Sequence, residues 1–432
     1  MKRKISLLIC ALMLLSSFLL SCGGGNGDGK ETTAPETTAA PDGALAPIPQ
    51  KLVPEFIAKN LVIYNANVNP VTVNIDERTT IDLIYQGWPT ICKGDGDTLY
   101  AASSLRMGHV DPFGATAFYV SHDGGETWEG PRVINDTPVD DRDTGIVYLG
   151  DGKLLITYFT IGGDEFMPGA HYEDQMTHHG NPAQVSALRR IWSQMTPEEL
   201  DNGYWMLFSD DYGETWSEPV KAPLTTPHGP VVVNDGSLLF CGNVDTSIVQ
   251  IHRSTDGGRT WEYRTEIPLP TQEETGVNYG FDEANIVQLR DGKYVAAIRA
   301  EDYANPSVTL CTFLSYSDDG INFTKAEKAE GVLGAPPHLL ELSNGALLMT
   351  YGYRGGDPND ERYGIRARVS YDGGQTWDEE ILLSESFTPD LGYPSTVELD
   401  DGTLITAYYQ PAEGDTVPNL LCTKWKLVEP TE

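Results

Sequence analysis

Short apolar segments alternate with two-residue turns along most of the chain. In each repeat an apolar segment is followed by Asp-Gly or Asn-Gly and then by a second apolar segment, which is the pattern of a β-hairpin. The turn glycines are Gly96, Gly152, Gly236, Gly292, Gly345 and Gly402. Successive glycines are 56, 84, 56, 53 and 57 residues apart. The pattern predicts six similar units of about 56 residues, with about 28 extra residues in the second interval.

A second repeat, the octapeptide Ser-x-Asp-x-Gly-x-Thr-Trp, is independent of the first. It occurs at residues 121–128, 209–216, 254–261 and 370–377, with a degenerate copy at 317–324. Asp and Gly suit a turn that needs positive φ angles. The octapeptide resembles the Asp-box of the sialidase superfamily, which joins the third and fourth strands of a propeller blade. The resemblance implies an all-β fold, a six-bladed β-propeller of four-stranded antiparallel blades.

We expect the propeller to occupy residues 51–430, with an insertion around 162–202. That stretch is poor in strand pattern and contains a helix-start signal, Thr196-Pro197-Glu198-Glu199. The sixth hairpin has no Asp-box. Residues 420–428 and a strand near 61–66 are therefore expected to complete the sixth blade and close the ring.

The N-terminal residues 1–22 have the pattern of a secretory signal. Three basic residues at positions 2–4 precede an apolar run at 5–20 that is too short to span a bilayer. The run ends in Leu19-Leu20-Ser21-Cys22, which resembles the bacterial lipobox and implies lipidation of Cys22; an ordinary signal-peptidase site nearby is the alternative. Residues 23–50, rich in Gly, Thr, Ala and Pro, predict a flexible linker. We expect an exported, cell-surface lipoprotein of a bacterium, held to the membrane by the lipid alone.

Charge narrows the range of partners. The chain has 29 basic and 63 acidic residues, a net charge of −34. This is the wrong sign for nucleic-acid binding, which depends on basic residues that neutralise phosphates. We expect a monomer that binds a glycan and needs no cofactor or metal, since the three histidines of the insertion, His171, His178 and His179, meet no metal-ligand spacing rule. The later cysteines are widely spaced and predict buried core residues rather than a disulfide framework.

Candidate site residues follow from propeller geometry. Ligands bind at the face formed by the loops that enter the first strand of each blade and the loops that join the second and third strands. Arginine, histidine, tyrosine and carboxylate residues concentrate in these loops, which is a composition suited to an acidic sugar. The candidates are Trp88, Arg142, His228, Glu283 and Tyr393 in the first set of loops, and Arg106, His109, Asp111, Arg299 and Arg354 in the second.

The resemblance to sialidases extends to particular residues. It implies that Tyr393 is the nucleophile, that Glu283 withdraws the tyrosine proton, and that Asp111, five residues after Arg106, is the acid/base. It also implies that Arg299 and Arg362 bind the substrate, because planar guanidinium groups pair well with a sugar carboxylate. A neutral tyrosine suits attack next to a carboxylate, since an anionic nucleophile would be repelled.

The sequence departs from the family at one motif. Sialidases have Arg-Ile-Pro at the start of the first inner strand, and that arginine completes a triad on the substrate carboxylate, whereas this chain has Gly87-Trp88-Pro89. Arg142 or Arg354 is a possible substitute, and Trp88 is a possible stacking platform for a different sugar.

Each candidate also has a structural interpretation. Tyr393 could pack in the central channel, and Glu283 could pair only with Arg299. Asp111 precedes a proline, a position where aspartate commonly caps a turn. Arg362 belongs to an alternating series with Arg366 and Arg368, which is typical of a solvated strand face.

Three functions are compatible with these residues. The leading prediction is an exo-acting glycoside hydrolase that releases a terminal acidic sugar through Tyr393. The second is a polysaccharide lyase, in which His109 takes the C5 proton of a uronic acid while Arg142 and Tyr393 assist. The third is a glycan-binding lipoprotein without catalysis.

Overall fold

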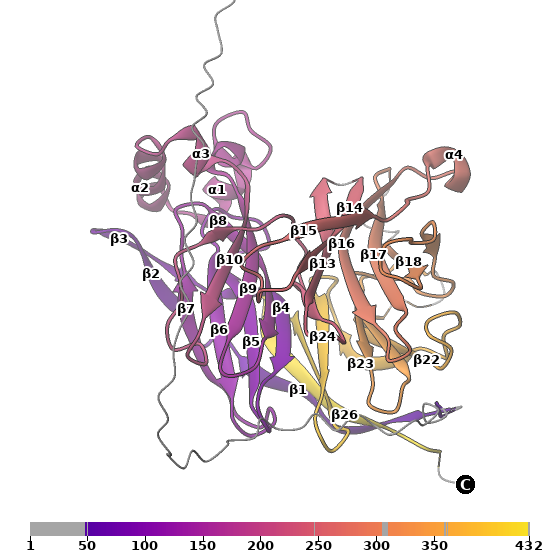
Figure 1. The fold of residues 1–432 in the computed structure, drawn as a ribbon. Helices are drawn as coiled ribbons and strands as arrows, with labels where there is room; N and C mark the ends of the chain where they lie inside the picture. The colour runs from indigo at the N-terminus through magenta and orange to yellow at the C-terminus, as the bar shows by residue number, and fades with distance from the viewer. Residues whose placement is uncertain are drawn as a thin grey trace, which may run out of the picture. The chain divides into compact units, whose positions relative to one another are not determined.

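Six four-stranded antiparallel sheets form the protein, as the repeats predict (Figure 1). The computed structural model describes residues 48–49, 51–245, 247–304, 310–357, 360 and 362–430. The predicted signal segment and the lipidation site Cys22 lie outside the described residues, as does nearly all of the predicted linker.

The blades follow one another along the chain. Their strands are β4 (Tyr85–Lys93), β5 (Leu99–Arg106), β6 (Ala115–Ser121) and β7 (Glu129–Asn135) in blade 1; β8 (Asp140–Tyr148), β9 (Leu154–Ile161), β10 (Gly203–Ser209) and β11 (Val220–Lys221) in blade 2; β12 (Val231–Val232), β13 (Leu238–Asp245), β14 (Ile248–Ser254) and β15 (Glu262–Glu266) in blade 3; β16 (Tyr279–Gln288), β17 (Tyr294–Asp302), β18 (Cys311–Ser317) and β19 (Glu327–Lys328) in blade 4; β20 (His338–Glu341), β21 (Leu347–Tyr353), β22 (Tyr363–Ser370) and β23 (Ile381–Ser386) in blade 5. Blade 6 contains β24 (Gly392–Glu398), β25 (Leu404–Gln410), β26 (Asn419–Val428) and, from the N-terminal side, β1 (Val53–Tyr64). The first strands of the blades lie nearest the axis, where β4 contacts β8 and β24, and β16 contacts β20.

Strand β1 closes the ring by pairing antiparallel with β26. The register runs from Val53 opposite Val428 to Tyr64 opposite Leu420. The closing strand is where the sequence predicts it but longer, because its first half continues along β26 beyond the predicted span 61–66. Closure of this kind joins the N-terminal part of the chain to the last blade, and the radial array of blades leaves only short, protected sheet edges.

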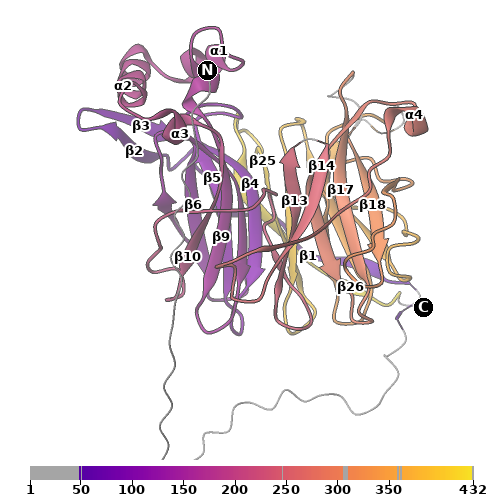
Figure 2. The same ribbon diagram turned by 45° about the horizontal axis from the view of Figure 1, so that its top comes forward.

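The insertion between β9 and β10 is helical. It comprises η1 (Gly163–Phe166), α1 (Glu173–His179), α2 (Pro182–Trp192) and α3 (Pro197–Leu200), which lie together at one end of the propeller (Figures 1 and 2). Asn181 and Thr196 cap α2 and α3, each followed by a proline, which explains why the helices begin there.

The insertion is packed firmly onto the propeller. Its buried side chains, Phe166, Met176 and Trp192, join the apolar cluster that includes Leu105 and Phe113 of blade 1. The Trp192 indole N–H donates to the carbonyl of Pro138 at 2.6 Å. Helix α2 also contacts a hairpin of β2 (Val71–Asp76) and β3 (Thr79–Leu83). A short helix, α4 (Gln272–Thr275), lies between blades 3 and 4.

The Asp-boxes are turns at the opposite end of the blades. In the first, the Asp123 carboxylate accepts hydrogen bonds from the backbone N–H of Thr127 at 2.9 Å and from its hydroxyl at 2.6 Å. The same pair of bonds recurs at Asp211, Asp256 and Asp372. Each turn follows the third strand of a blade, which ends away from the face where the first strands begin. The boxes therefore stabilise blades rather than contribute to a site.

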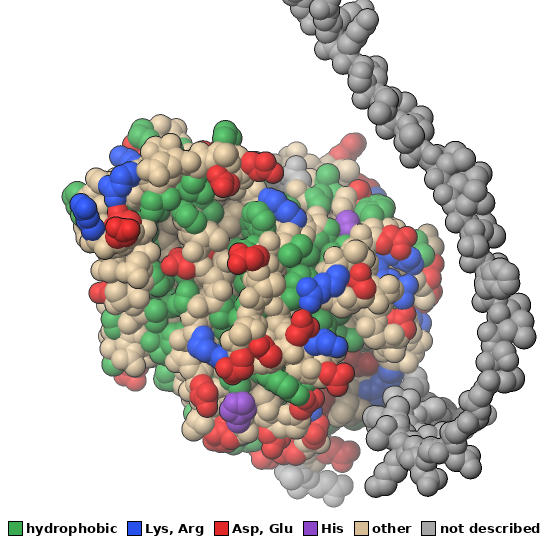
Figure 3. Space-filling model, turned by 60° about the vertical axis from the view of Figure 1, so that its left-hand side comes forward, with side chains coloured by type: hydrophobic (Ala, Val, Ile, Leu, Met, Phe, Trp, Pro, Cys, Tyr) green, Lys and Arg blue, Asp and Glu red, His purple; other side chains and the backbone are tan. Residues whose placement is uncertain are grey.

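The surface agrees with the acidic composition. The face in Figure 3 carries interspersed acidic and basic side chains and no extended basic patch. Cys92, Cys241, Cys311 and Cys422 are free, and all except the partly exposed Cys92 are buried. Within the described part of the chain, no helix is long and apolar enough to cross a membrane.

Candidate active site

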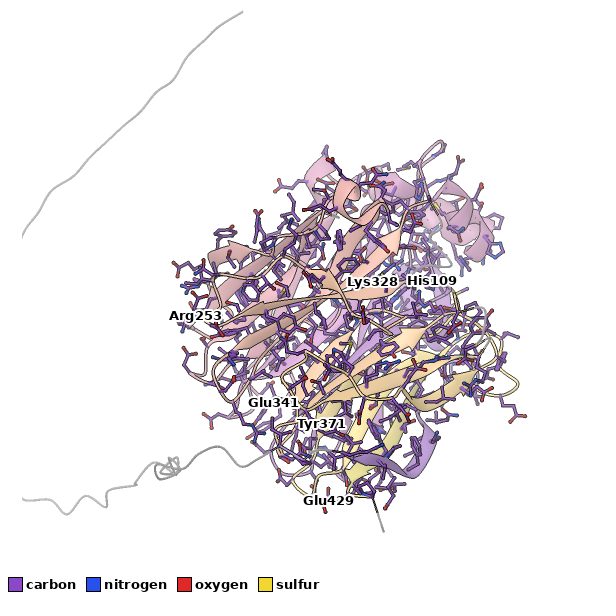
Figure 4. The ribbon with its side chains drawn as sticks, turned by 90° about the vertical axis from the view of Figure 1, so that its right-hand side faces the viewer. His109, Arg253, Lys328, Glu341, Tyr371 and Glu429 are labelled. Atoms are coloured by element: carbon purple, nitrogen blue, oxygen red, sulfur yellow. The ribbon has the colours of Figure 1, made fainter. Side chains whose placement is uncertain are left out.

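A cavity of about 930 Å³ opens where the inner strands of blades 1, 2, 4 and 6 begin, next to the insertion. Figure 4 shows one of its residues, His109, nearer the insertion helices than Glu341 or Glu429. Residues from all six blades and the insertion surround it: Trp88, His109, Val110, Arg142, Asp143, Phe159, Thr160, Ile161, Glu165, His171, Tyr172, Asn202, Tyr204, Thr225, Thr226, Pro227, Asn243, Val244, Asp282, Glu283, Arg299, Arg354 and Tyr393.

Tyr393, Glu283 and Arg299 form a hydrogen-bonded group in this cavity. The Tyr393 hydroxyl donates to Oε1 of Glu283. Nη1 of Arg299 lies 2.6 Å from the same carboxylate oxygen and 3.5 Å from the tyrosine oxygen. Burial, together with the nearby negative charges of Glu283 and Asp143, holds the pKa of Tyr393 well above its usual value. Tyr393 is therefore a neutral phenol that already donates its proton toward a carboxylate.

In four blades a β-bulge in the first strand positions a side chain in the cavity. The strand register breaks between Gly87 and Thr90, between Arg142 and Gly145, between Asp282 and Asn285, and between Gly392 and Ser395. In each β-bulge one residue has a positive φ: Trp88 at 52°, Asp143 at 49°, Glu283 at 48° and Tyr393 at 51°. All four line the cavity. A non-glycine residue in this region costs about 1–3 kcal/mol, and such strain concentrates at functional sites.

Sequence reasoning missed Asp143, although a signal for it exists. Asp143, Glu283 and Tyr393 each lie nine residues before the turn glycine of their hairpin, at Gly152, Gly292 and Gly402. Comparison of the hairpins by this offset would have placed Asp143 with the other two.

The cavity arginines differ in their partners. Arg299 is surrounded by carboxylates, because it contacts Asp282 at 3.5 Å and Glu301 at 2.8 Å in addition to Glu283. Arg354 donates to the Leu391 carbonyl and to the Tyr409 hydroxyl, both at 2.9 Å. Among the described residues no carboxylate forms an ion pair with Arg354. Its guanidinium lies 5.8 Å from the centre of the Tyr393 ring. Arg354 is thus a cavity arginine whose charge is not paired with a carboxylate of the described residues.

Trp88 does not provide the stacking platform that the sequence suggested. Its side chain is only 1% exposed, within an aromatic cluster with Tyr85, Tyr393 and Tyr409. The Arg142 guanidinium lies 4.2 Å from the centre of the indole ring and covers one of its faces. Trp88 therefore holds Arg142 at the cavity wall through a cation–π contact.

His109 forms a separate polar network at the cavity rim. Its Nδ1 lies 3.1 Å from Oδ1 of Asp390 and 2.9 Å from the Tyr85 hydroxyl, which itself donates to Asp390 at 2.7 Å. The shared carboxylate acceptor favours the tautomer with the proton on Nδ1, which leaves Nε2 as the basic nitrogen. Desolvation lowers the pKa of His109, and the hydrogen bond to Asp390 opposes that effect.

The structure does not place Asp111 in the cavity, contrary to the sequence prediction. Its side chain is 0% exposed. One carboxylate oxygen accepts from the backbone N–H of Gly108 at 2.8 Å and the other from that of Phe113 at 2.9 Å. Asp111 therefore caps the turn before Pro112, and its carboxylate is not positioned to reach a substrate.

Three predicted substrate-binding residues also lie outside the cavity. Arg106 is fully buried and bonds to the Gly108 carbonyl, the Asp111 carbonyl and the Asp140 carboxylate. Arg362 lies just before β22, is 59% exposed and pairs with Asp360 at 2.8 Å, whereas Arg366 of the same series is buried. His228 is buried edge-on against His338, with a distance of 5.1 Å between ring centres. Burial holds the pKa of His228 well below its usual value, so this residue stays neutral.

The insertion forms one wall of the cavity through Glu165, His171, Tyr172 and Asn202. No sequence motif marks these residues, because their approach to the site depends on how the insertion packs on blade 1. No group of three or more His, Cys, Asp or Glu side chains in the described residues could hold a metal ion.

Sequence comparison agrees with the fold. Residues 170–406 match the model of the BNR repeat-like domain family, and residues 119–129 match the BNR/Asp-box repeat. The first match covers more than half of the chain. The chain belongs to the BNR repeat-like domain family. This BNR-repeat propeller is also 24% identical over 342 residues to a sialidase from Bacteroides fragilis strain YCH46, a match that covers 72% of the chain and 56% of that relative. The chain thus spans little more than half the length of that protein.

Solved structures similar to this BNR-repeat propeller confirm the sialidase-superfamily fold. A protein of unknown function from Dyadobacter fermentans DSM 18053 has a TM-score of 0.65 at 21% identity, covering 87% of this chain and 99% of that one. Trypanosoma rangeli sialidase in complex with sialic acid has a TM-score of 0.53 at 15% identity, covering 89% of this chain and 60% of that one.

Replacement of Arg106 tests whether that residue is structural. Arg106→Met leaves the buried carboxylate of Asp140 without its main cation, so the free energy of unfolding should fall by about 3–5 kcal/mol in chemical denaturation. The double variant Arg106→Met/Asp140→Asn should recover part of this loss, because Asn carries no charge. A single variant with parental stability but weakened glycan binding would instead identify Arg106 as a ligand contact.

Proposed function

We propose that this protein is an exo-acting glycoside hydrolase that releases a terminal acidic sugar from glycans, with Tyr393 as nucleophile. The hydrogen bond from the Tyr393 hydroxyl to Glu283 is the observation that carries this proposal. The nucleophile is buried in a cavity, neutral, and in contact with the group that would accept its proton. The similarity to sialidases supports the same reaction class.

The reaction would proceed in two steps. In the first, the Tyr393 oxygen attacks the anomeric carbon while Glu283 takes the phenolic proton, and the bond to the leaving alcohol breaks as that oxygen gains a proton from an acid. In the second, water attacks the anomeric carbon and gives a proton to the conjugate base of that acid, the bond to Tyr393 breaks, and Glu283 returns its proton to the tyrosine oxygen. Arg299 stabilises Glu283 as a carboxylate through its contact at 2.6 Å.

Arg354 supports an acidic sugar as the substrate. Its position beside the Tyr393 ring places it near the sugar carbon that the tyrosine would attack. An arginine whose charge is not used by a protein carboxylate favours a ligand carboxylate, since charge-assisted pairs strengthen in a desolvated cavity. Arg142, held against Trp88, provides a second cation on the adjoining wall. These two arginines would compensate for the arginine that Gly87 replaces.

The cellular setting is proposed from the sequence alone. A signal segment with Cys22 in a lipobox-like motif suggests that the propeller acts at a bacterial surface as a monomer tethered by lipid. Glycans outside the cell would then be the accessible substrates.

Loss of the nucleophile is the most direct test. Tyr393→Phe should lower turnover of acidic glycans by about 10³-fold or more, because the covalent step is lost while the ring still packs. The measurement is mass analysis of sugars released from sialylated and uronate-containing glycans. Tyr408→Phe is the matched control, since Tyr408 is equally buried and its hydroxyl bonds to Thr423. Parental activity in Tyr393→Phe would contradict the mechanism, and glycan binding without products in the parent would favour a non-catalytic protein.

Recognition of the carboxylate can be tested separately. Arg354→Gln should reduce kcat/KM for the acidic substrate about 10–100-fold, the value of one or two charge-assisted hydrogen bonds. The same variant should have little effect on a substrate in which the carboxylate is reduced to an alcohol. Arg362→Gln, an exposed arginine outside the cavity, is the control that should match the parent. Equal losses on both substrates would contradict the assignment of Arg354.

The His109 network favours a second candidate, a uronate lyase. A histidine whose Nδ1 faces Asp390, and whose Nε2 forms no hydrogen bond with the described residues, is arranged as a neutral general base. His109 would take the C5 proton of a uronic acid, and the bond from C4 to the leaving oxygen would break as a double bond forms between C4 and C5.

The lyase candidate predicts a distinct product. Cleavage should yield a sugar with the ultraviolet absorbance of a conjugated alkene and no mass gain of water. His109→Gln should then abolish cleavage, and Asp390→Asn should slow it and shift its acid limb, because His109 must be neutral to act as a base. Hydrolysis products from a fully active His109→Gln variant would rule against elimination.

A further inference from the structure

Hydrolysis through Tyr393 requires an acid, and the residues identified so far do not include one. The leaving oxygen of a glycan is a poor leaving group unless it is protonated as its bond breaks. Glu283 must accept the Tyr393 proton and cannot donate at the same moment. Asp111, the residue that the sequence resemblance implies, has both carboxylate oxygens bonded to backbone N–H groups outside the cavity.

We propose that Asp143, rather than Asp111, donates the proton to the leaving oxygen, an inference that rests on the proposed glycosidase function. Asp143 occupies in blade 2 the same bulge position that Glu283 occupies in blade 4 and Tyr393 in blade 6, with φ within 3° of both. It lines the same cavity as these two residues. A β-bulge of the same kind therefore positions the nucleophile, its base and the Asp143 carboxyl group.

The other acidic residues beside Asp143 have structural partners. Asp140 binds Arg106 at 2.9 Å. Asp141 is buried and accepts from Asn135 at 2.9 Å and from the backbone N–H of Thr137 at 2.8 Å. Oδ1 of Asp140 also accepts no hydrogen bond, but it lies 2.9 Å from Nη2 of Arg106, whereas no cation of the described residues forms an ion pair with Asp143. Its Oδ1 is buried and has no hydrogen-bond partner among the described residues. A buried carboxyl oxygen without a partner is costly unless it is protonated or meets a ligand.

The surroundings of Asp143 suit an acid at neutral pH. Burial and the negative charge of Glu283 raise the pKa of Asp143 to about 7, against the opposing effect of Arg142. Because the folded pKa is raised, the proton is held below about pH 7 and lost above it. The pKa of Asp282 is also raised to about 7, but its carboxylate faces Arg299 at 3.5 Å. Asp282 is therefore the rival that the experiment must exclude.

With Asp143 as the acid, every proton transferred in the two steps has a donor and an acceptor. In the first step its carboxyl proton passes to the glycosidic oxygen as the bond from that oxygen to the anomeric carbon breaks. The new bond to Tyr393 forms as Glu283 takes the phenolic proton. In the second step the Asp143 carboxylate takes a proton from the attacking water, and Glu283 returns its proton to the departing Tyr393. Both carboxyl groups end in their starting states.

Leaving-group dependence tests this role in the full-length chain. The probes are paired 4-nitrophenyl and lactose-linked glycosides of N-acetylneuraminic acid and of glucuronic acid, and the sugar that the parent releases is used. Asp143→Asn should lower kcat/KM for the lactose-linked substrate about 10²–10⁴-fold, the usual contribution of general acid catalysis. Its effect on the 4-nitrophenyl substrate should be less than about tenfold, because nitrophenolate leaves without a proton.

A pH profile supplies a second, independent measurement that needs no variant. With the lactose-linked substrate, kcat/KM of the parent should fall as pH rises through about 7, the pKa of Asp143. The fall should be absent with the 4-nitrophenyl substrate. A flat parental profile between about pH 6 and 8 on the lactose-linked substrate would overturn the role.

Other outcomes also decide the matter. Equal losses of Asp143→Asn on both substrates, or leaving-group selectivity in Asp282→Asn instead, would overturn the role of Asp143 while leaving the glycosidase intact. A parent that cleaves no member of the panel would overturn the proposed function and this role with it.

Discussion

Closure of the ring by β1 and β26 is the constraint on which the site depends. A propeller blade positions its inner strand only relative to its neighbours, so an open array would let the first and last blades separate. Pairing of Val53–Tyr64 with the final strand fixes blade 6 against blade 1 and brings β24 next to β4. Tyr393 and Glu283, 110 residues apart in sequence, meet because six blades share one axis. Loss of this pairing would remove the outer strand of blade 6, the blade that carries Tyr393.

The site concentrates charge that the propeller must stabilise. Arg299 with its three carboxylate neighbours, and Arg106 with Asp140, place several ions where water is largely excluded. Buried ions of one sign would be unfavourable, and each group here is balanced by the opposite sign within about 3.5 Å. The exceptions are informative. Arg354 retains charge that no described carboxylate neutralises, and Asp143 retains an oxygen without a partner, so both are available to a ligand.

The sequence predicted the fold well because the fold is repetitive. Six hairpin glycines and four Asp-boxes record the blades directly, and the closing strand follows from the incomplete sixth repeat. The site was predicted only in part. Tyr393 and Glu283 were found because they lie near the start of inner strands, and Arg299 because it lies near the end of the next strand, where position in the repeat determines position in space. Arg362 and Asp111 were misplaced because spacing along the chain does not reveal whether a side chain points toward the axis or into a turn. The wall formed by Glu165 and His171 depends on tertiary packing, which no local pattern encodes.

The structure gives Gly87-Trp88-Pro89, which stands where sialidases have Arg-Ile-Pro, a role that the sequence did not suggest. In isolation it suggested either a lost carboxylate site or a new stacking surface. Trp88 instead lies beneath Arg142, so a large aromatic residue in blade 1 supports a cation supplied by blade 2. Arg354 approaches from blade 5 on the side of Tyr409. A ligand carboxylate bound by Arg142 and Arg354 would be approached from blades 2 and 5, whereas an arginine at position 87 would approach it from blade 1. Under the proposed function, the sugar carboxylate would therefore be oriented differently in this cavity than in a sialidase that has the Arg-Ile-Pro arginine.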